Sequence, residues 1–306
     1  MARETMIEAR QVGKQFDGKT ILEDVTFRVP KGKVVGLLGP NGSGKTTIVR
    51  LLNGVITAER GEMTVGGMDP RTEGNAIRQM SGVVTEGAGL YPDMSAAENL
   101  SFFADLYGVK RAKARVDELL EQFQLTAVRD RRVGSYSTGM KRRAALAKAL
   151  LHAPELLFLD EPTNGLDPDG IRDVIGFLQE LNRTQGTTIL LCSHVLHQLE
   201  NICGEYLFLD KGRLIEQGTR EDLEQRYRGT VQLRVETGLP IAAGTGIYAG
   251  YPVEQVANGV LQFTLPSKDA ITGLLQTIAG ESWIHSAERV NRDLESLYFE
   301  VRGKLL

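Results

Sequence analysis

The residues with the clearest chemical purpose form the stretch Gly39-Pro40-Asn41-Gly42-Ser43-Gly44-Lys45-Thr46-Thr47. It fits the pattern G-x-x-x-x-G-K-[ST]. The glycines let the backbone approach a polyphosphate, because no Cβ stands in the way. Successive backbone N–H groups then form a concavity for phosphate oxygens. Lys45 adds a positive charge for the terminal phosphates, and the Thr46 hydroxyl can ligate Mg²⁺. This stretch predicts a site for a nucleoside triphosphate.

Other side chains suited to chemistry follow apolar runs later in the chain. Asp160 and Glu161 end the run that begins at Leu156, and His194 follows the apolar segment 187–191. An aspartate at the tip of a strand beside a phosphate loop can hold Mg²⁺, and Glu161 can polarise water as a general base. His194 is either a ligand-contacting residue at the sheet edge or an ordinary surface or core histidine. Phe16, upstream of the loop, is either a core aromatic or a stacking surface for a purine base.

These residues need particular elements around them. Val34 to Leu38 is a short apolar run that predicts a buried strand, and helical spacing follows the glycine loop. Residues 5–30 alternate around a turn at Asp17-Gly18, which predicts antiparallel strands. Met80 to Val84 predicts a buried strand leading to Glu86. The pattern turns helical from Met94 to about Val128, beginning with a capping box at Ser95 and Glu98. A further Ala/Leu-rich helix is predicted from Arg143 to Leu151.

Composition narrows the class of protein. The 306 residues are 42% apolar and 25% charged, with a formal net charge of −3. These values are ordinary for a globular protein and give no reason to expect nucleic-acid binding. Two cysteines are too few for a disulfide framework, and we expect both to be buried thiols. No apolar run reaches the length of a transmembrane helix, so we expect any membrane role to act through a partner subunit.

The pattern changes after residue 228. Alternating runs flank Asn258-Gly259, which is a strong hairpin signal. Amphipathic helices are predicted over residues 268–279 and 291–302. We expect residues 229–306 to form a small α+β domain, with a ferredoxin-like arrangement as one option. It serves either as a stabilising or dimerising appendage or as a regulatory ligand domain.

Taken in order, the motifs over residues 5–226 resemble the ATP-binding cassette of ABC transporters. They are the phosphate loop, Ser137-Thr138-Gly139-Met140, Leu156 to Glu161, Gly165-Leu166-Asp167 and His194. The resemblance implies an α/β fold over residues 1–228, with a P-loop NTPase-type core, an antiparallel β subdomain and a helical insertion at about 94–150. It is closest in character to the branch that exports drugs and ions.

The resemblance also implies a role for each matching residue. Gly39 to Thr47 is similar to the Walker A loop, and Asp160 to the magnesium carboxylate that with Thr46 binds the metal. Glu161 is similar to the catalytic glutamate, and His194 to the histidine that senses the γ-phosphate. Phe16 matches the aromatic residue that stacks on adenine. Glu86 stands where most cassettes have a glutamine near Mg²⁺, which makes it a third candidate metal ligand.

One group of motifs implies a partner. Ser137, Thr138 and Gly139 resemble the signature motif, which in this family reaches the ATP bound by the opposite subunit, and Asp167 resembles the aspartate at the dimer seam. Thr138 departs from the usual glycine. A single cassette therefore cannot close its own site, and two must pair head to tail with ATP between them.

The resemblance implies an ATP-binding and ATP-hydrolysing subunit of an ABC transporter, with ATP and Mg²⁺ as cofactors. Its expected partners are a second cassette, as homodimer or heterodimer, and integral membrane permease subunits, without nucleic acid. It would be cytoplasmic and peripheral on the inner face of the membrane. The alternative is a soluble ABC ATPase acting on ribosomes or DNA, but the chain shows neither a second cassette nor a long coiled coil. A P-loop GTPase would need an Asn-Lys-x-Asp motif, which is absent.

Overall fold

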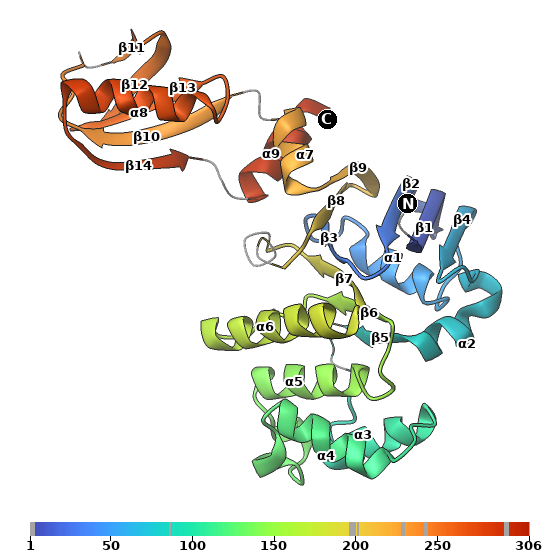
Figure 1. Ribbon diagram of the computed structural model, residues 1–306. Coiled ribbons are helices and arrows are strands. Elements are labelled where there is room, and N and C mark those ends of the chain that lie inside the picture. The colour runs from blue at the N-terminus through green and yellow to red at the C-terminus, as the bar shows by residue number, and fades with distance from the viewer. Residues whose placement is uncertain are drawn as a thin grey trace. The chain divides into compact units, whose positions relative to one another are not determined.

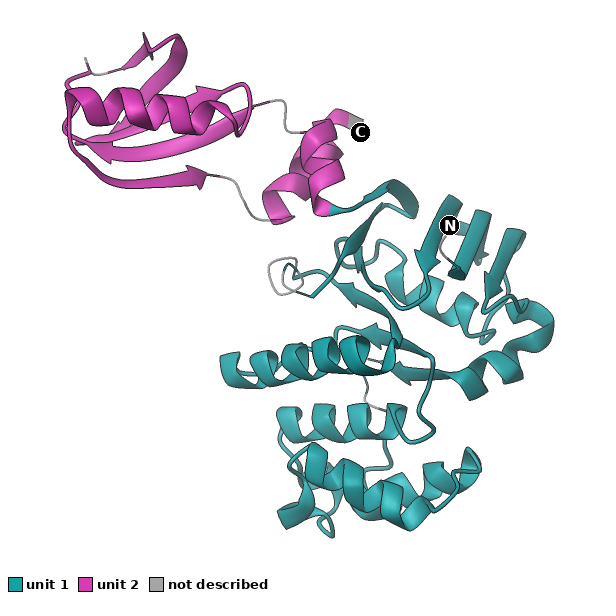
Figure 2. Ribbon diagram, in the orientation of Figure 1, with its two compact units in different colours: residues 1–219 teal, residues 220–306 magenta. Residues whose placement is uncertain are grey.

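The structure is a computed structural model that describes residues 4–85, 87, 89–195, 200, 202–227, 230–241, 244–290 and 294–305. The chain divides into two compact units, residues 1–219 and 220–306 (Figure 2). The division falls before the boundary expected at residue 228, because helix α7 (Arg220–Tyr227) contacts helix α9 (Leu294–Leu305) of the second unit.

A mixed sheet of six strands forms the centre of the first unit. Its order is β5 (Ser81–Val84), β6 (Leu156–Asp160), β7 (Thr188–Ser193), β3 (Val34–Leu38), β8 (Glu205–Asp210) and β9 (Arg213–Gly218). All neighbours are parallel except β8 and β9. Every residue of β3, β6 and β7 is buried, as the apolar runs predict for strands covered on both faces. Their carboxyl ends meet at one edge, where ligands bind in such sheets.

The predicted antiparallel subdomain is confirmed. Strands β1 (Thr5–Phe16), β2 (Lys19–Pro30) and β4 (Arg60–Val65) pair in the order β2-β1-β4. Asp17 and Gly18 turn the hairpin with φ values of 48° and 77°, the positive values that a tight two-residue hairpin requires. Helix α1 (Lys45–Leu52) follows β3, and α2 (Pro70–Met80) precedes β5.

The predicted helical insertion is also present, and Figure 1 shows its helices together, in green, below the six-stranded sheet. It contains α3 (Ala96–Leu106), α4 (Ala112–Gln122), short turns at Thr126–Val128 and Val133–Ser135, and α5 (Thr138–Ala149). The capping box at Ser95 is confirmed, because its hydroxyl accepts from the Glu98 N–H at 3.2 Å and Glu98 Oε2 accepts from the Ser95 N–H at 2.7 Å. Helix α6 (Pro168–Gln185) lies between β6 and β7 in the chain.

Helix α5 begins earlier than the sequence suggested. We expected a helix from Arg143, but it starts at Thr138, so the signature-like residues form its first turn. The reason is local, because the Ser137 hydroxyl accepts from the Met140 N–H at 3.3 Å and so caps the helix.

The second unit contains one antiparallel sheet in the order β11 (Thr245–Tyr248), β12 (Tyr251–Ala257), β13 (Val260–Leu265), β10 (Val231–Thr237) and β14 (Ile284–Val290). The Asn258-Gly259 hairpin is confirmed as the β12–β13 connection. The ferredoxin-like option is wrong, because that fold alternates two helices with its strands. Here β10 to β13 follow one another, and only α8 (Ala270–Glu281) intervenes before β14. No helix in the described ranges combines the length and apolar character needed to cross a membrane.

Candidate nucleotide site

The glycine-rich loop between β3 and α1 is held tightly by its surroundings. A Cβ on Gly39 would lie 2.1 Å from the carbonyl oxygen of Leu209, and one on Gly44 would lie 2.5 Å from a methyl of Leu22. Gly44 also has a φ of 111°, which disfavours any side chain. No side chain caps α1, and N–H groups at an uncapped helix N-terminus can bind an anion.

Lys45 is the buried cation of this loop, with 6% of its surface exposed. Its ammonium donates to the carbonyl oxygens of Gly39 at 2.8 Å and Pro40 at 3.3 Å. It also lies 3.9 Å from Oε1 of Glu161. A buried charge needs such partners. They hold the ammonium at the loop, where terminal phosphates would lie.

Thr46 and Asp160 meet across the gap between α1 and β6. The Thr46 hydroxyl donates to Oδ2 of Asp160 at 2.8 Å. Hydroxyl and carboxylate oxygens are suitable ligands for Mg²⁺, and adjacent corners of its octahedron lie about 2.9 Å apart for bonds of about 2.0–2.1 Å. These two residues therefore fit the metal that the sequence predicts.

Glu161 is anchored by the end of β7. Oε1 accepts from the His194 backbone N–H at 3.0 Å and lies 2.9 Å from its Nδ1. Oε2 accepts from the Ser193 hydroxyl at 3.1 Å. The Glu161 backbone has a φ of 51°, a left-handed conformation that costs a non-glycine residue about 1–3 kcal/mol. The carboxylate and the imidazole expected from the sequence are therefore together.

A cavity of about 500 Å³ brings these groups to one place. Its lining residues are Lys19, Ile21, Asn41, Gly42, Gly44, Lys45, Thr46, Thr47, Asp160, Glu161, Asn164 and His194. Of the loop residues expected to bind nucleotide, Gly39, Pro40 and Ser43 support the loop without lining this cavity. The Ser43 hydroxyl is buried and has no hydrogen-bond partner among the described residues.

The sequence missed three lining residues, Lys19, Ile21 and Asn164. Lys19 and Ile21 project from the same face of β2, since side chains alternate along a strand, and this alternation was the available signal. The expected Phe16 does not line the cavity, although it pairs with Lys19 across the hairpin. Its ring is 42% exposed and lies 4.8 Å from the Lys14 ammonium.

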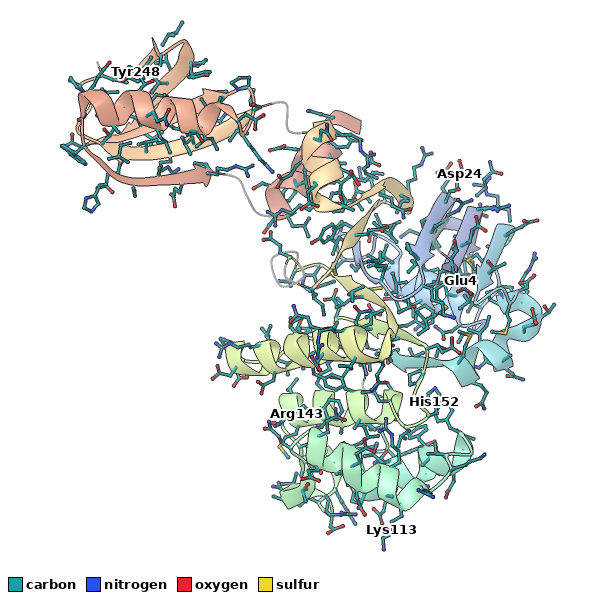
Figure 3. The ribbon with its side chains drawn as sticks, viewed as in Figure 1. Glu4, Asp24, Lys113, Arg143, His152 and Tyr248 are labelled. Carbon is teal, nitrogen blue, oxygen red and sulfur yellow. The ribbon has the colours of Figure 1, made fainter. Side chains whose placement is uncertain are left out.

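The signature-like residues border a second cavity, also of about 500 Å³. It is lined by Ser137, Thr138, Gly139, Arg143, Gly165, Leu166, Asp167, Asp169, Gly170, Asp173 and Val174. Asp167 caps α6, because its Oδ1 accepts from the Gly170 N–H at 2.9 Å. Arg143, labelled in Figure 3, lines this cavity from the middle of α5. The two cavities share no lining residue.

Glu86, the third expected metal ligand, lies outside the described residues. The adjacent Thr85 carbonyl accepts from Nη1 of the buried Arg142 at 3.0 Å. Both cysteines are buried, as expected. Burial raises the pKa of the Cys192 thiol, and nearby Asp160 raises it further, so Cys192 stays a neutral thiol beneath the site.

Comparison with known proteins identifies the family. A family model described as ABC transporter matches residues 22–164. The linearmycin resistance ATP-binding protein LnrL of Bacillus subtilis (strain 168) is 34% identical over 98% of this chain and 99% of its own. The daunorubicin resistance ATP-binding protein DrrA3 of Streptomyces coeruleorubidus is 39% identical over 74% of this chain and 72% of its own.

A solved structure of an ATP-binding subunit of an ABC transporter superposes with a TM-score of 0.68 and 30% identity, covering 73% of this chain and 94% of its own. These likenesses favour a transporter subunit over a ribosome- or DNA-acting ATPase. This chain belongs to the ABC transporter family, and it is an ATP-binding and ATP-hydrolysing subunit of such a transporter.

Proposed function

We propose that this chain hydrolyses ATP in a site shared with a second cassette, and that site closure drives an exporting permease. One observation carries the proposal: the phosphate-loop cavity and the signature cavity have no residue in common. Each chain thus offers two half-sites that do not meet within it. Head-to-tail pairing of two copies, a two-fold symmetric contact in which each chain presents both halves, would complete two sites at once.

In the phosphate half-site, the loop backbone and Lys45 bind the phosphates. Thr46 and Asp160 would hold Mg²⁺, and the bound ion would neutralise negative charge on the phosphates. The support is their oxygen pair, which lies 2.8 Å apart and joins the buried Asp160 to the exposed Thr46. From the sequence resemblance we also propose Glu86 as a ligand of this metal and Phe16 as the ring that stacks on adenine.

Glu161 acts as the general base that takes a proton from the attacking water. Its carboxylate lines the cavity beside Lys45 and is fixed by the end of β7. His194 senses the terminal phosphate. The support is that it lines the cavity and that its Nδ1 lies 2.9 Å from Oε1 of Glu161, which leaves Nε2 for a ligand. A well-placed base contributes about 10²–10⁴-fold in rate.

In the other half-site, Ser137, Thr138 and Gly139 contact the partner's ATP from the first turn of α5, and Asp167 lies at the seam. The support is that Ser137 and Thr138 are exposed although they begin a well-formed helix. A helix N-terminus with free N–H groups favours a phosphate. Closure is driven by the higher affinity of ATP for the paired state than for the open one.

We infer that site closure changes the conformation of a permease in the membrane, and that the chain works at the inner face of the cell membrane. Export is supported by the relatives, whose names describe resistance to linearmycin and daunorubicin. Isolation of the tagged chain from membranes should recover an integral membrane protein. Recovery with ribosomes or DNA instead would contradict this part of the proposal.

The shared site can be tested by mixing two impaired variants. Lys45→Ala disables the phosphate half, and Gly139→Asp disables the signature half. A mixed dimer contains one site made from two intact halves, so random pairing should restore about a quarter of the parent turnover. Each variant alone should turn over at about a tenth of the parent rate or less. No recovery at concentrations where the parent pairs would show that two copies of this chain do not share a site.

A further inference from the structure

Ser193 is the last residue of β7 and is fully buried. It has no place among the motifs that the sequence singled out. Strand β7 runs parallel to β6, with Cys192 opposite Asp160. This register brings Ser193 beside Glu161, which follows β6 directly. The position is therefore set by the sheet and not by a flexible loop.

The Ser193 hydroxyl is oriented by two hydrogen bonds. Its oxygen accepts from the Val195 N–H at 3.0 Å, while its proton goes to Oε2 of Glu161 at 3.1 Å. Because the backbone donor approaches the oxygen, the single hydroxyl proton is left for the carboxylate. A hydrogen bond to a charged acceptor is stronger than one between neutral groups.

The two carboxylate oxygens of Glu161 are held by different residues. Oε1 is shared by the His194 backbone N–H, its Nδ1 and, at 3.9 Å, the Lys45 ammonium. These contacts hold Oε1, whereas rotation about the Cγ–Cδ bond moves both oxygens of the carboxylate. Within the described part of the chain, Ser193 provides the hydrogen bond to Oε2 and so adds the second anchor that opposes this rotation.

We propose that Ser193 is a positioning residue for the hydrolytic step, because its hydroxyl fixes the rotation of the Glu161 carboxylate. This inference rests on the proposed role of Glu161 as general base. Ser193 does not line the cavity and so does not touch nucleotide. It acts on the chemical step through Glu161, and nucleotide binding does not depend on it.

The test is Ser193→Ala, a smaller side chain that the buried site accommodates. We expect kcat for ATP to fall about tenfold to a hundredfold, as misplaced catalytic groups do. The KM and the affinity for ATP should stay within about twofold, because Lys45 and the loop are untouched. Ser193→Thr keeps the hydroxyl and should restore most of kcat.

Ser81→Ala is the matched control. Ser81 is also a buried strand residue whose hydroxyl makes a hydrogen bond, to Oδ1 of Asn53 at 3.2 Å, but it lies at the start of β5. Both substitutions should lower the thermal midpoint to a similar degree, whereas only Ser193→Ala should lower kcat. If Ser193→Thr does not fold, the two alanine variants still decide the question.

Two further measurements separate positioning from general stability. A nucleotide-free crystal structure of Ser193→Ala should show the Glu161 carboxylate rotated about its Cγ–Cδ bond. In a Glu161→Gln background, Ser193→Ala should leave the residual single-turnover rate unchanged, since residues that act as a unit are non-additive. An unrotated carboxylate, or an additive loss of rate, would overturn the proposal.

The outcomes also distinguish this inference from the proposed function. If Glu161→Gln is inactive while Ser193→Ala turns over like Ser81→Ala, only the role of Ser193 is wrong. If Glu161→Gln turns over like the parent, the general base itself is misassigned.

Discussion

The two proposed half-sites differ in how their polar groups are held. Lys45, Asp160 and Glu161 of the phosphate half-site are at most 9% exposed, and several have contacts inside the chain. Ser137 and Thr138 of the signature half-site are exposed. The first half-site is arranged to hold charge and perform chemistry within one chain, where preorganisation stabilises a transition state. The second offers a surface that gains its contacts only on pairing.

The largest effect should come from the chemical step. Glu161→Gln removes the base while keeping its shape and one acceptor oxygen, so turnover should fall about 10²–10⁴-fold. ATP binding should persist and trap the closed dimer, seen as an ATP-dependent increase in mass on size-exclusion chromatography with light scattering. Glu155→Gln, an exposed carboxylate just before β6, is the control. Normal turnover in Glu161→Gln would contradict the assignment.

The next effect concerns binding within one chain. Lys45→Ala removes a buried charge whose contacts to phosphate are worth about 1.5–3 kcal/mol, a loss of about 10–100-fold in ATP affinity. Isothermal titration measures it at concentrations where the chain is monomeric. Lys113→Ala, at an exposed position of α4, should bind ATP like the parent. Equal affinity in both variants would refute the phosphate-loop role of Lys45.

A substitution in the signature half-site should reduce pairing and turnover but leave the ATP affinity of the monomer unchanged, the reverse of Lys45→Ala. A Cβ on Gly139 meets its nearest neighbour, a Leu166 methyl, at an ordinary 3.5 Å, so Gly139→Asp should fold. Its carboxylate would face the partner's phosphates, where like charges cost several kcal/mol, so turnover and ATP-dependent pairing should fall by about tenfold or more. ATP affinity of the monomer should not change.

Gly176→Asp adds the same charge to an open glycine in α6 and is the control for Gly139→Asp. It should pair and hydrolyse ATP like the parent. A loss of monomer affinity in Gly139→Asp would place the signature residues at the chain's own nucleotide and remove the distinction between the half-sites.

The smallest effect concerns the departure at Thr138. A Cβ on Gly165 would lie 2.8 Å from the Thr138 methyl, so these residues are matched in size. Gly165→Ala should lower pairing several-fold, and less so in a Thr138→Ser chain that lacks the methyl. A double-mutant cycle should give a coupling free energy of about 0.5–3 kcal/mol between the two residues. Gly165 has a φ of 75°, and the strain that Gly165→Ala adds there is the same in both backgrounds, so the cycle cancels it. Additive effects would show that the two residues do not constrain each other.

Much of the fold was predictable because its signals are local. The apolar runs of β3, β6 and β7, the capping box at Ser95 and the Asn258-Gly259 hairpin each follow from neighbouring residues. The start of a helix was harder to predict. Helix α5 begins at Thr138 because Ser137 caps it, and the sequence pattern did not indicate that cap. The ferredoxin-like option failed because no helix separates β10 to β13 along the chain, and the order of strands in the second unit depends on long-range pairing.

The sequence alone determined the chemistry available at the site. The spacing of Gly39, Gly44, Lys45 and Thr46 specifies a phosphate-binding backbone, since the glycines admit the phosphates and Lys45 supplies the charge. Asp160, Glu161 and His194 were found because each ends an apolar run.

Only the tertiary structure decided what surrounds those groups. The parallel register of β6 and β7 places Ser193 on Glu161, and the hairpin brings Lys19 and Ile21 to the cavity. The structure also separates the signature cavity from the phosphate cavity. These contacts join residues far apart in the chain. Their free energies depend on side-chain packing and strand register, which no short stretch of sequence encodes.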